Sequence, residues 1–153
     1  MTGYSAISRS IGPYRTGAAA HLLYCWAVDD LRLDDLAAVF TEDCTFDRDH
    51  GEVIQGRLAL IYFLIHRLLD IYSAITHHLA NVWLDVDGDQ ARSRSYVHAF
   101  HRFRVGGTVA ERWGTYENDL VRSGEGWRIA HRRLRAHGTK GFPEGAFEFR
   151  ERA

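Results

Sequence analysis

The feature that most constrains the fold of this chain is a change in hydrophobic period near Ser73. Before this residue, apolar side chains recur at the spacing of α-helices. After it come four long runs rich in β-branched and aromatic residues, over 75–86, 90–105, 109–122 and 127–136. Turn sequences separate the runs, at Asp87-Gly88, Gly106-Gly107 and Ser123-Gly124-Glu125-Gly126. The pattern therefore predicts helices followed by an antiparallel meander.

Three helices are predicted in the first half of the chain. Residues 18–28 and 33–40 form a short pair with Val28-Asp29-Asp30 at the bend. Residues 57–72 give the strongest helical pattern, with apolar side chains along one side at Leu60, Ile61, Leu64, Leu68 and Ile71. Between these segments, residues 46–56 are predicted to be irregular chain with one short strand.

This order of elements predicts an α+β fold, a cone-shaped barrel in which three helices pack on a curved antiparallel sheet. A chain of 153 residues with 46% hydrophobic content suits one domain over residues 1–153. Residues 1–17 lack periodicity and are predicted to be an N-terminal arm. Residues 139–153 form a C-terminal tail, whose phenylalanines fit a lid over the cone and a packed segment equally well.

Charge and cysteine content narrow the function classes. Lys and Arg number 19 against 20 Asp and Glu, so the chain lacks the basic surface of a nucleic-acid binder. Charged residues or histidines interrupt every long apolar stretch, which argues against a membrane span or signal peptide. Cys25 and Cys44 are expected to be buried thiols in a reducing compartment. We therefore expect a cytoplasmic protein with no nucleic-acid or membrane partner.

Two polar sites stand out in apolar surroundings, Asp29 at the helical bend and residues 76–81 at the start of the first strand. A carboxylate held against an imidazole in an apolar pocket can transfer protons without a cofactor. His77 and His78 are neighbours on a strand and must point to opposite faces, and we expect His77 to enter the pocket. Asn81 shares the alternating face of His77 and is a candidate for a hydrogen bond to the substrate or to the histidine.

The third candidate, His101, lies on the following strand, and its face depends on the connection between the two strands. A two-residue turn at Asp87-Gly88 places His77 opposite His98 and sends His101 to the other face. A three-residue turn, or one β-bulge in either strand, returns His77 and His101 to the same face. The sequence leaves both possibilities open.

Each candidate also has a structural interpretation. Asp29 or Asp30 can cap the following helix, and most aromatic side chains can belong to the core. The arginines of residues 128–135 fit a last strand with solvated charges, although an inward Arg132 could polarise a carbonyl or hold a leaving anion. No histidine spacing joined to a carboxylate predicts a metal site, and no nucleophile motif surrounds a serine or cysteine.

The order of features resembles the nuclear transport factor two-like superfamily, in particular its SnoaL-like branch with scytalone dehydratase and lindane dehydrochlorinase. The resemblance covers roughly residues 18–134. It rests on the following segments: Ala27-Val28-Asp29, Leu36-x-x-Val39-Phe40-Thr41-Glu42-Asp43, Thr76-His77-His78-x-x-Asn81, Asp87-Gly88-Asp89-x-Ala91, His101-Arg102-Phe103, Gly114-Thr115-Tyr116 and Gly126-Trp127-Arg128-Ile129.

The resemblance implies a mechanism for this site. In the dehydratase and the dehydrochlorinase, an aspartate of the helical hairpin pairs with a histidine of the first long strand to remove a proton from carbon. Those positions fall on Asp29 and His77, and the second histidine of the dehydratase falls on His101. Two tyrosines that hold a water in the dehydratase correspond here to Val28 and Arg48, which argues against scytalone itself as the substrate.

We therefore expect a cofactor-independent dehydratase or isomerase without a metal, acting on a small, mostly apolar ring compound. Asp29, His77 and His101 are the predicted catalytic residues, and the predicted substrate-binding residues are Asn81, Tyr24, Trp113, Tyr116 and Arg132. A polyketide cyclase-like enzyme and a noncatalytic ligand-binding or small-subunit module are the alternatives. An epoxide hydrolase fits less well, because the Asp-Arg-Asp arrangement of that class is not found. Cones of this kind suggest a homo-oligomer, a dimer or a trimer.

Overall fold

The computed structural model describes residues 17–48, 53–124 and 126–149. The first half contains helices α2 (Gly17–Asp29) and α3 (Leu33–Val39), strands β1 (Phe40–Asp47) and β2 (Ile54–Gln55), helix α4 (Arg57–His66) and the π-helical turn η1 (Arg67–Ile71). Four long strands follow, β3 (Tyr72–Asp87), β4 (Gln90–Phe103), β5 (Val109–Ser123) and β6 (Gly126–Lys140). Apart from Gly17, the predicted N-terminal arm lies outside the described residues.

The six strands form one sheet in the order β2-β1-β6-β5-β4-β3. Strands β3 to β6 pair antiparallel in sequence order, as the four runs predict. However, β1, which the sequence did not predict as a long strand, runs parallel to β6, so the sheet as a whole is mixed. The reason lies at Phe40, where the backbone becomes extended directly after α3 and begins a strand that covers the free edge of β6.

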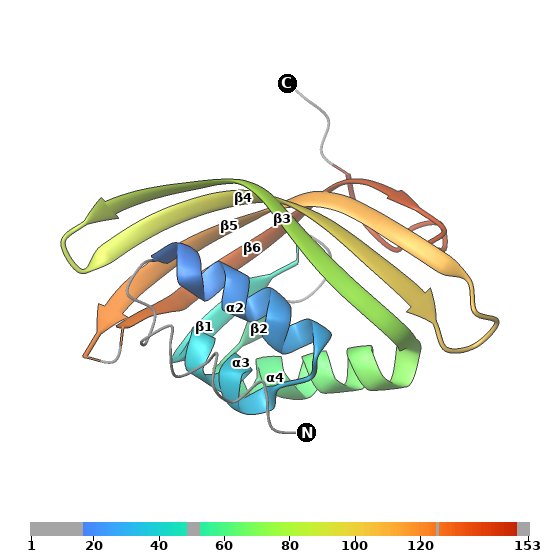
Figure 1. Cartoon of the computed structure of the whole chain (residues 1–153), viewed down its shortest axis with the longest axis horizontal. Coiled ribbons are helices and arrows are strands. Elements are labelled where there is room, and N and C mark those ends of the chain that lie inside the picture. The colour runs from blue at the N-terminus through green and yellow to red at the C-terminus, as the bar shows by residue number, and fades with distance from the viewer. Residues whose placement is uncertain (1–16, 49–52, 125, 150–153) are drawn as a thin grey trace.

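The curved sheet arches over α2, α3 and α4, which cover its concave face (Figure 1). Buried side chains from both layers form one hydrophobic core between them, including Tyr24, Leu36, Phe40, Leu60 and Ile129. The predicted α+β cone with three helices on a curved sheet is confirmed. It positions residues at the end of α2 against the concave face of β3 and β4.

A bulge in β3 sets which residues share the concave face. The turn consists of Gly88 and Asp89, one residue later than predicted, because Asp87 pairs with Gln90. Continued without interruption, this register would set His77 opposite Phe100 and turn His101 to the far face. The register instead shifts between Ala80 and Trp83, and His77 pairs with Ala99. The alternative with one bulge is therefore the correct one, and it brings His77 and His101 to the same face.

The described part of the C-terminal tail packs against this end of the sheet. The ring of Phe142 lies with its centroid 5.2 Å from that of His101 and 5.9 Å from that of Phe103. Phe147 packs in turn against Phe142, at 5.2 Å. The tail therefore places two phenylalanine rings next to His101, with Phe142 in direct contact and Phe147 behind it.

Candidate active site

The local structure at the end of α2 fixes the position of Asp29. The amide of Arg32 donates to the carbonyl of Ala27 at 2.8 Å, and the amide of Leu31 donates to that of Val28 at 3.3 Å. With Leu31 at a positive φ of 54°, these bonds form a Schellman motif that ends the helix. A carboxylate in the last helical turn meets the negative end of the helix dipole, at a cost of about 0.3–1 kcal/mol. Asp29 therefore needs a partner outside the helix.

That partner is His77. The ring Nδ1 of His77 lies 2.6 Å from one carboxylate oxygen of Asp29, and its backbone N–H donates to the other oxygen at 2.8 Å. The side chain of His77 is 4% exposed and that of Asp29 is 17% exposed. Because an ionised carboxylate can only accept, the ring proton resides on Nδ1 and the lone pair on Nε2. This is the tautomer required of a base that acts through Nε2.

The surroundings of His77 keep its imidazole neutral. Burial lowers the pKa of His77 below its usual range, and the hydrogen bond and negative charge of Asp29 offset part of that effect. The positive charges of Arg112 and Arg132 act in the same direction as burial. A neutral imidazole with an oriented lone pair is the form that accepts a proton.

His101 lies beside His77 on the same face, with ring centroids 6.1 Å apart in an edge-to-face arrangement. It is 4% exposed, and its Nδ1 is buried without a hydrogen-bond partner among the described residues. Burial, followed by the positive charge of Arg112, lowers the pKa of His101 to about 3. At neutral pH this ring therefore offers a hydrogen bond rather than a positive charge.

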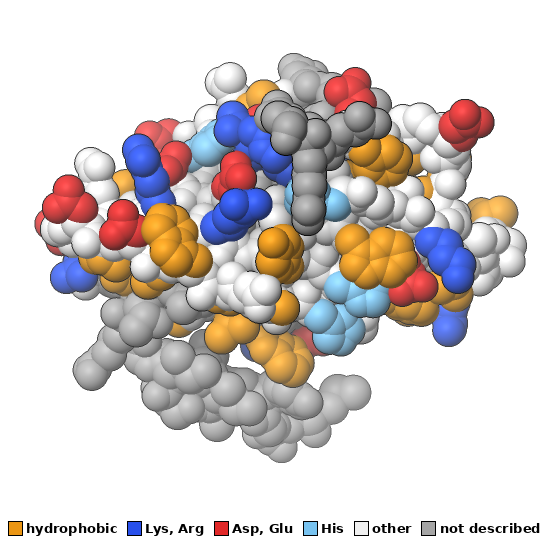
Figure 2. Space-filling view, turned by 90° about the horizontal axis from the view of Figure 1, so that it is seen from above, with side chains coloured by type: hydrophobic (Ala, Val, Ile, Leu, Met, Phe, Trp, Pro, Cys, Tyr) orange, Lys and Arg blue, Asp and Glu red, His pale blue; other side chains and the backbone are white. Residues whose placement is uncertain are grey.

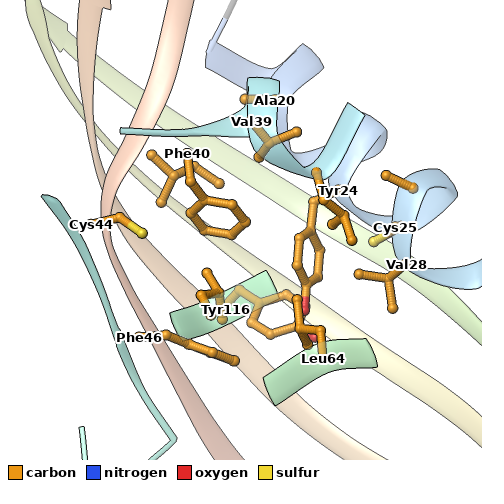
Figure 3. Packing of buried hydrophobic residues seen from close by; sticks show 14 of the residues in the cluster. Ala20, Tyr24, Cys25, Val28, Val39, Phe40, Cys44, Phe46, Leu64 and Tyr116 are labelled. Carbon is orange, nitrogen blue, oxygen red and sulfur yellow. The ribbon is translucent and has the colours of Figure 1, made fainter. Parts of the chain in front are cut away.

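Tyr24, Tyr116 and Arg132, three of the predicted substrate-binding residues, are buried on the inner side of the fold. Figure 3 shows Tyr24 reaching from α2 toward Tyr116, and the two rings meet edge to face at 5.8 Å. The ring of Tyr24 also lies 6.3 Å from that of His77. Burial raises the pKa of both tyrosines, so both hydroxyls stay protonated. They form a rigid aromatic wall behind the dyad.

Arg132 is fully buried. Its guanidinium carbon lies 3.8 Å from the ring centroid of Tyr24 and 4.5 Å from that of Tyr116, and its Nε donates to Asn118 at 2.7 Å. The Asn118 amide in turn contacts His21, which ties the cation into a buried polar network. Rings on two sides and one amide therefore compensate for part of the cost of burying this charge.

Two of the predicted substrate-binding residues do not lie beside the dyad. Trp113 pairs with His98 and stacks on its ring at 5.1 Å on the convex face, because the β4–β5 register turns its neighbours Arg112 and Gly114 inward. The placement of Trp113 in the pocket is thus wrong. Asn81 sits in the β-bulge with a positive φ of 52° and an exposed side chain, so the expected alternation with His77 does not hold.

Tyr72 and Arg112 also lie at this site, although neither is among the predicted site residues. The ring of Tyr72 lies 4.7 Å from that of His101. Arg112 is 7% exposed and faces inward from β5, opposite Ala99. Arg112 lies two residues after the apolar Ala110, and this alternation indicates that both side chains point inward. Only the register of β3, β4 and β5 shows that Arg112 lies in the same row as His77.

A separate groove of about 800 Å³ opens on the convex face of the sheet. It is lined by outward side chains of β3 to β6, among them His78, Tyr96, His98 and Trp113. Figure 2 looks onto this side of the molecule, where histidine and apolar side chains gather. The sheet itself separates the groove from Asp29 and His77, so we do not assign the groove to the dyad.

Within the described ranges, no three His, Cys, Asp or Glu side chains are arranged to hold a metal ion. Both cysteines are buried and unpaired, and burial raises the pKa of Cys25 to about 12 and that of Cys44 to about 11. Neither thiol therefore offers a ready nucleophile. None of the helices described is both long and apolar enough to cross a membrane.

Comparison with known proteins identifies a family for this chain. The SnoaL-like domain family matches residues 18–133 of the chain. The uncharacterized protein Rv2910c of Mycobacterium tuberculosis is 36% identical over 114 residues, which cover 71% of this chain and 75% of that relative.

Solved structures extend the similarity to the whole fold. A provisionally named scytalone dehydratase from Novosphingobium aromaticivorans is 25% identical and has a TM-score of 0.82, covering 100% of this chain and 99% of that one. A hexachlorocyclohexane dehydrochlorinase (LinA) structure is 15% identical, with a TM-score of 0.77 over 94% of this chain and 95% of that chain. At this identity the second structure is similar in fold alone.

Proposed function

The chain belongs to the SnoaL-like domain family, and on this premise we propose that it is a cofactor-independent dehydratase or isomerase for a small ring compound. The family and its structural neighbours support small-molecule chemistry of this class. The reaction begins with removal of a carbon-bound proton next to a carbonyl group. The substrate is mostly apolar and lies near the aromatic wall of Tyr24 and Tyr116.

In the proposed mechanism, Nε2 of His77 takes the proton and the electron pair of the broken C–H bond forms an enolate. Asp29 keeps the ring oriented and stabilises the imidazolium that results. In a dehydratase, the carbon–oxygen bond then breaks, and the departing hydroxide takes the proton from His77 to leave as water. In an isomerase, the proton returns to a different carbon. His101 donates a hydrogen bond to the substrate oxygen in both cases.

The observation that carries this proposal is the pair of hydrogen bonds between Asp29 and His77. A buried carboxylate without a partner costs several kcal/mol, and a helix C-terminus adds to that cost. A noncatalytic module predicts the two residues to be apart or exposed. Their contact, with the neutral state favoured for His77, matches the needs of a general base.

Exchange of carbon-bound hydrogen for deuterium tests the proposal whatever the leaving group is. Cyclic ketones and hydroxyketones are incubated with the protein in deuterated buffer and followed by NMR. We expect exchange next to the carbonyl group, and a loss of about 10²–10⁴-fold in the His77→Gln variant.

The matched control is His78→Gln, which changes the exposed neighbour on the opposite face and should leave exchange unchanged. Circular dichroism checks that both variants fold. Full exchange activity in a folded His77→Gln protein would rule out His77 as the base. Ligand binding without exchange in the wild-type protein would favour the noncatalytic module.

A further inference from the structure

Three arginines from separate parts of the chain lie close enough to Tyr72, the neighbour of His101, for their charges to act on its hydroxyl. Arg48 follows β1, Arg67 begins η1, and Arg112 lies in β5. The guanidinium carbons of Arg48 and Arg67 lie 4.8 Å and 5.4 Å from the ring centroid of Phe63. Both cations therefore contact the same aromatic ring. The guanidinium carbon of Arg112 lies 5.5 Å from the ring centroid of Phe147.

Tyr72 connects the three arginines to the catalytic residues. Its ring contacts that of His101, and the charges of Arg112, Arg67 and Arg48 all oppose the rise in pKa that burial causes at its hydroxyl. All three positive charges therefore act on the side chain that borders His101.

The register of the sheet places Arg112 close to His77. His77 pairs with Ala99 in β4, and Ala99 pairs with Arg112 in β5, so the three residues form one row across the concave face. Strands are about 4.8 Å apart, which separates the backbones of His77 and Arg112 by about 10 Å. Because the middle residue is an alanine, no long side chain of this row fills the space between the base and the cation.

The three cations have no carboxylate counterion in the described part of the chain. Within residues 17–48, 53–124 and 126–149, no Asp or Glu lies within ion-pair distance of Arg48, Arg67 or Arg112. Arg112 is only 7% exposed, and its Nε has no hydrogen-bond partner among these residues. Burial and the charges of Arg67 and Arg112 lower the pKa of Arg48, as expected of cations that repel each other. Several other arginines of the described chain do have a carboxylate partner, such as Arg57 with Glu42 and Arg133 with Asp47.

We propose that Arg48, Arg67 and Arg112 form a subsite for an oxyanion, a carboxylate or a phosphate carried by the ring compound whose proton His77 removes. The proposal rests on the function proposed above and narrows its substrate class from an apolar ring to a ring with one anionic group. The guanidinium groups bind the oxyanion, and Phe63, Tyr72 and Phe147 border the ring that carries it. The arginines therefore set the orientation of the substrate relative to His77.

Binding of simple probes tests the subsite separately from catalysis. Benzoate, phenyl phosphate and the neutral benzamide are titrated by calorimetry at constant ionic strength, with the wild-type protein and with His77→Ala. We expect one or both anions to bind both proteins, and benzamide to bind at least about tenfold more weakly. The preferred anion then distinguishes a carboxylate from a phosphate.

Substitution of the arginines completes the test. Arg112→Gln should weaken anion binding by about tenfold or more, whereas the matched control Arg94→Gln, on the exposed face of β4, should not. If Arg112→Gln does not fold, Arg48→Gln and Arg67→Gln at less buried positions replace it. Equal binding of benzamide and benzoate, unchanged affinity in the folded arginine variants, or no anion binding at millimolar concentration would overturn the subsite.

The two proposals can fail independently. Anion binding that depends on the arginines, without deuterium exchange on any ketone, would preserve the subsite and remove the catalytic role of His77. Exchange that depends on His77 but does not change in the arginine variants would preserve the catalytic role of His77 and remove the subsite.

Discussion

The carboxylate of Asp29 bridges the ring and the backbone of His77, with one oxygen for each. The contact therefore fixes both the imidazole and the strand that carries it. This pair of hydrogen bonds between the end of α2 and β3 fixes the orientation of the ring and its tautomer.

Asp29→Asn should reduce proton exchange by about 10²–10⁴-fold. The amide can accept from only one of the two His77 donors, and its own N–H group faces the other. Loss of the negative charge also removes an interaction that raises the pKa of His77, so this pKa should fall further. NMR of the ring nitrogens reports the tautomer and the titration. Asp30→Asn, an exposed neighbour, is the control, and undiminished exchange by a folded Asp29→Asn protein would contradict the assignment.

Acidification should destabilise the fold through two buried histidines. The pKa values of His21 and His101 fall from 6.5 to about 3 on folding, mainly because both rings are buried. Between these values the unfolded chain binds more protons than the folded chain. Stability is therefore complete above pH 6.5 and declines as the pH falls through this window, by about 1.4 kcal/mol per pH unit for each histidine.

Urea unfolding at neutral pH and at about pH 5 measures this slope. His101→Gln should lower the slope by about 1.4 kcal/mol per pH unit, whereas His78→Gln at an exposed position should not change it. An identical slope in wild type and His101→Gln would show that His101 titrates normally in the folded protein.

Asn81→Val should destabilise the protein by about 1–2 kcal/mol. Asn81 adopts a left-handed conformation with a φ of 52°, which asparagine and glycine tolerate and a β-branched residue does not. Asn81→Gly is the matched control and should retain both stability and exchange activity. The measurement is the free energy of unfolding, and a valine variant as stable as the glycine variant would show that the bulge does not need this backbone conformation.

Gly114→Ala should destabilise the fold by at least about 1–3 kcal/mol. A Cβ atom at Gly114 would lie 2.3 Å from the backbone oxygen of Arg135 on β6, and neither backbone can move without disturbing the sheet. Gly138→Ala is the control, since no atom lies within 4 Å of a Cβ placed there. Thermal unfolding of the two variants gives the comparison, and equal midpoints would contradict the close approach.

Local patterns predicted much of the fold because helical and strand periods are distinct in this sequence, and buried and exposed side chains alternate along most of β4. Successive side chains of any strand point to opposite faces, so His77 and His78 could be separated from the sequence alone. The contact of His77 with Asp29 on the concave face agrees with this prediction. The pairing of β1 with β6 could not be predicted in this way, because no short-range pattern identifies a partner strand from the other end of the chain.

The differences at the site come from strand register. Asn81 is predicted by alternation from His77, which fails because a bulge interrupts the strand. Trp113 is predicted from its aromatic side chain, and residue type alone does not show which face of the sheet it occupies. The bulge at Asn81 depends on the left-handed backbone of one residue, which several residue types can adopt. Arg112 was missed for a related reason, since its position beside His77 depends on two successive strand registers.

The parallel pairing of β1 with β6 bears on how the chain reaches this structure. Thr45 in β1 and His131 in β6 are hydrogen bonded across 86 residues of sequence. Contacts of such separation slow folding, and during synthesis β6 leaves the ribosome only after β3, β4 and β5 have been made. Until then, β1 has an unpaired edge that can pair with other chains. We therefore expect nascent chains that stop before Gly126 to aggregate, and folding yield to depend on how quickly translation passes this point.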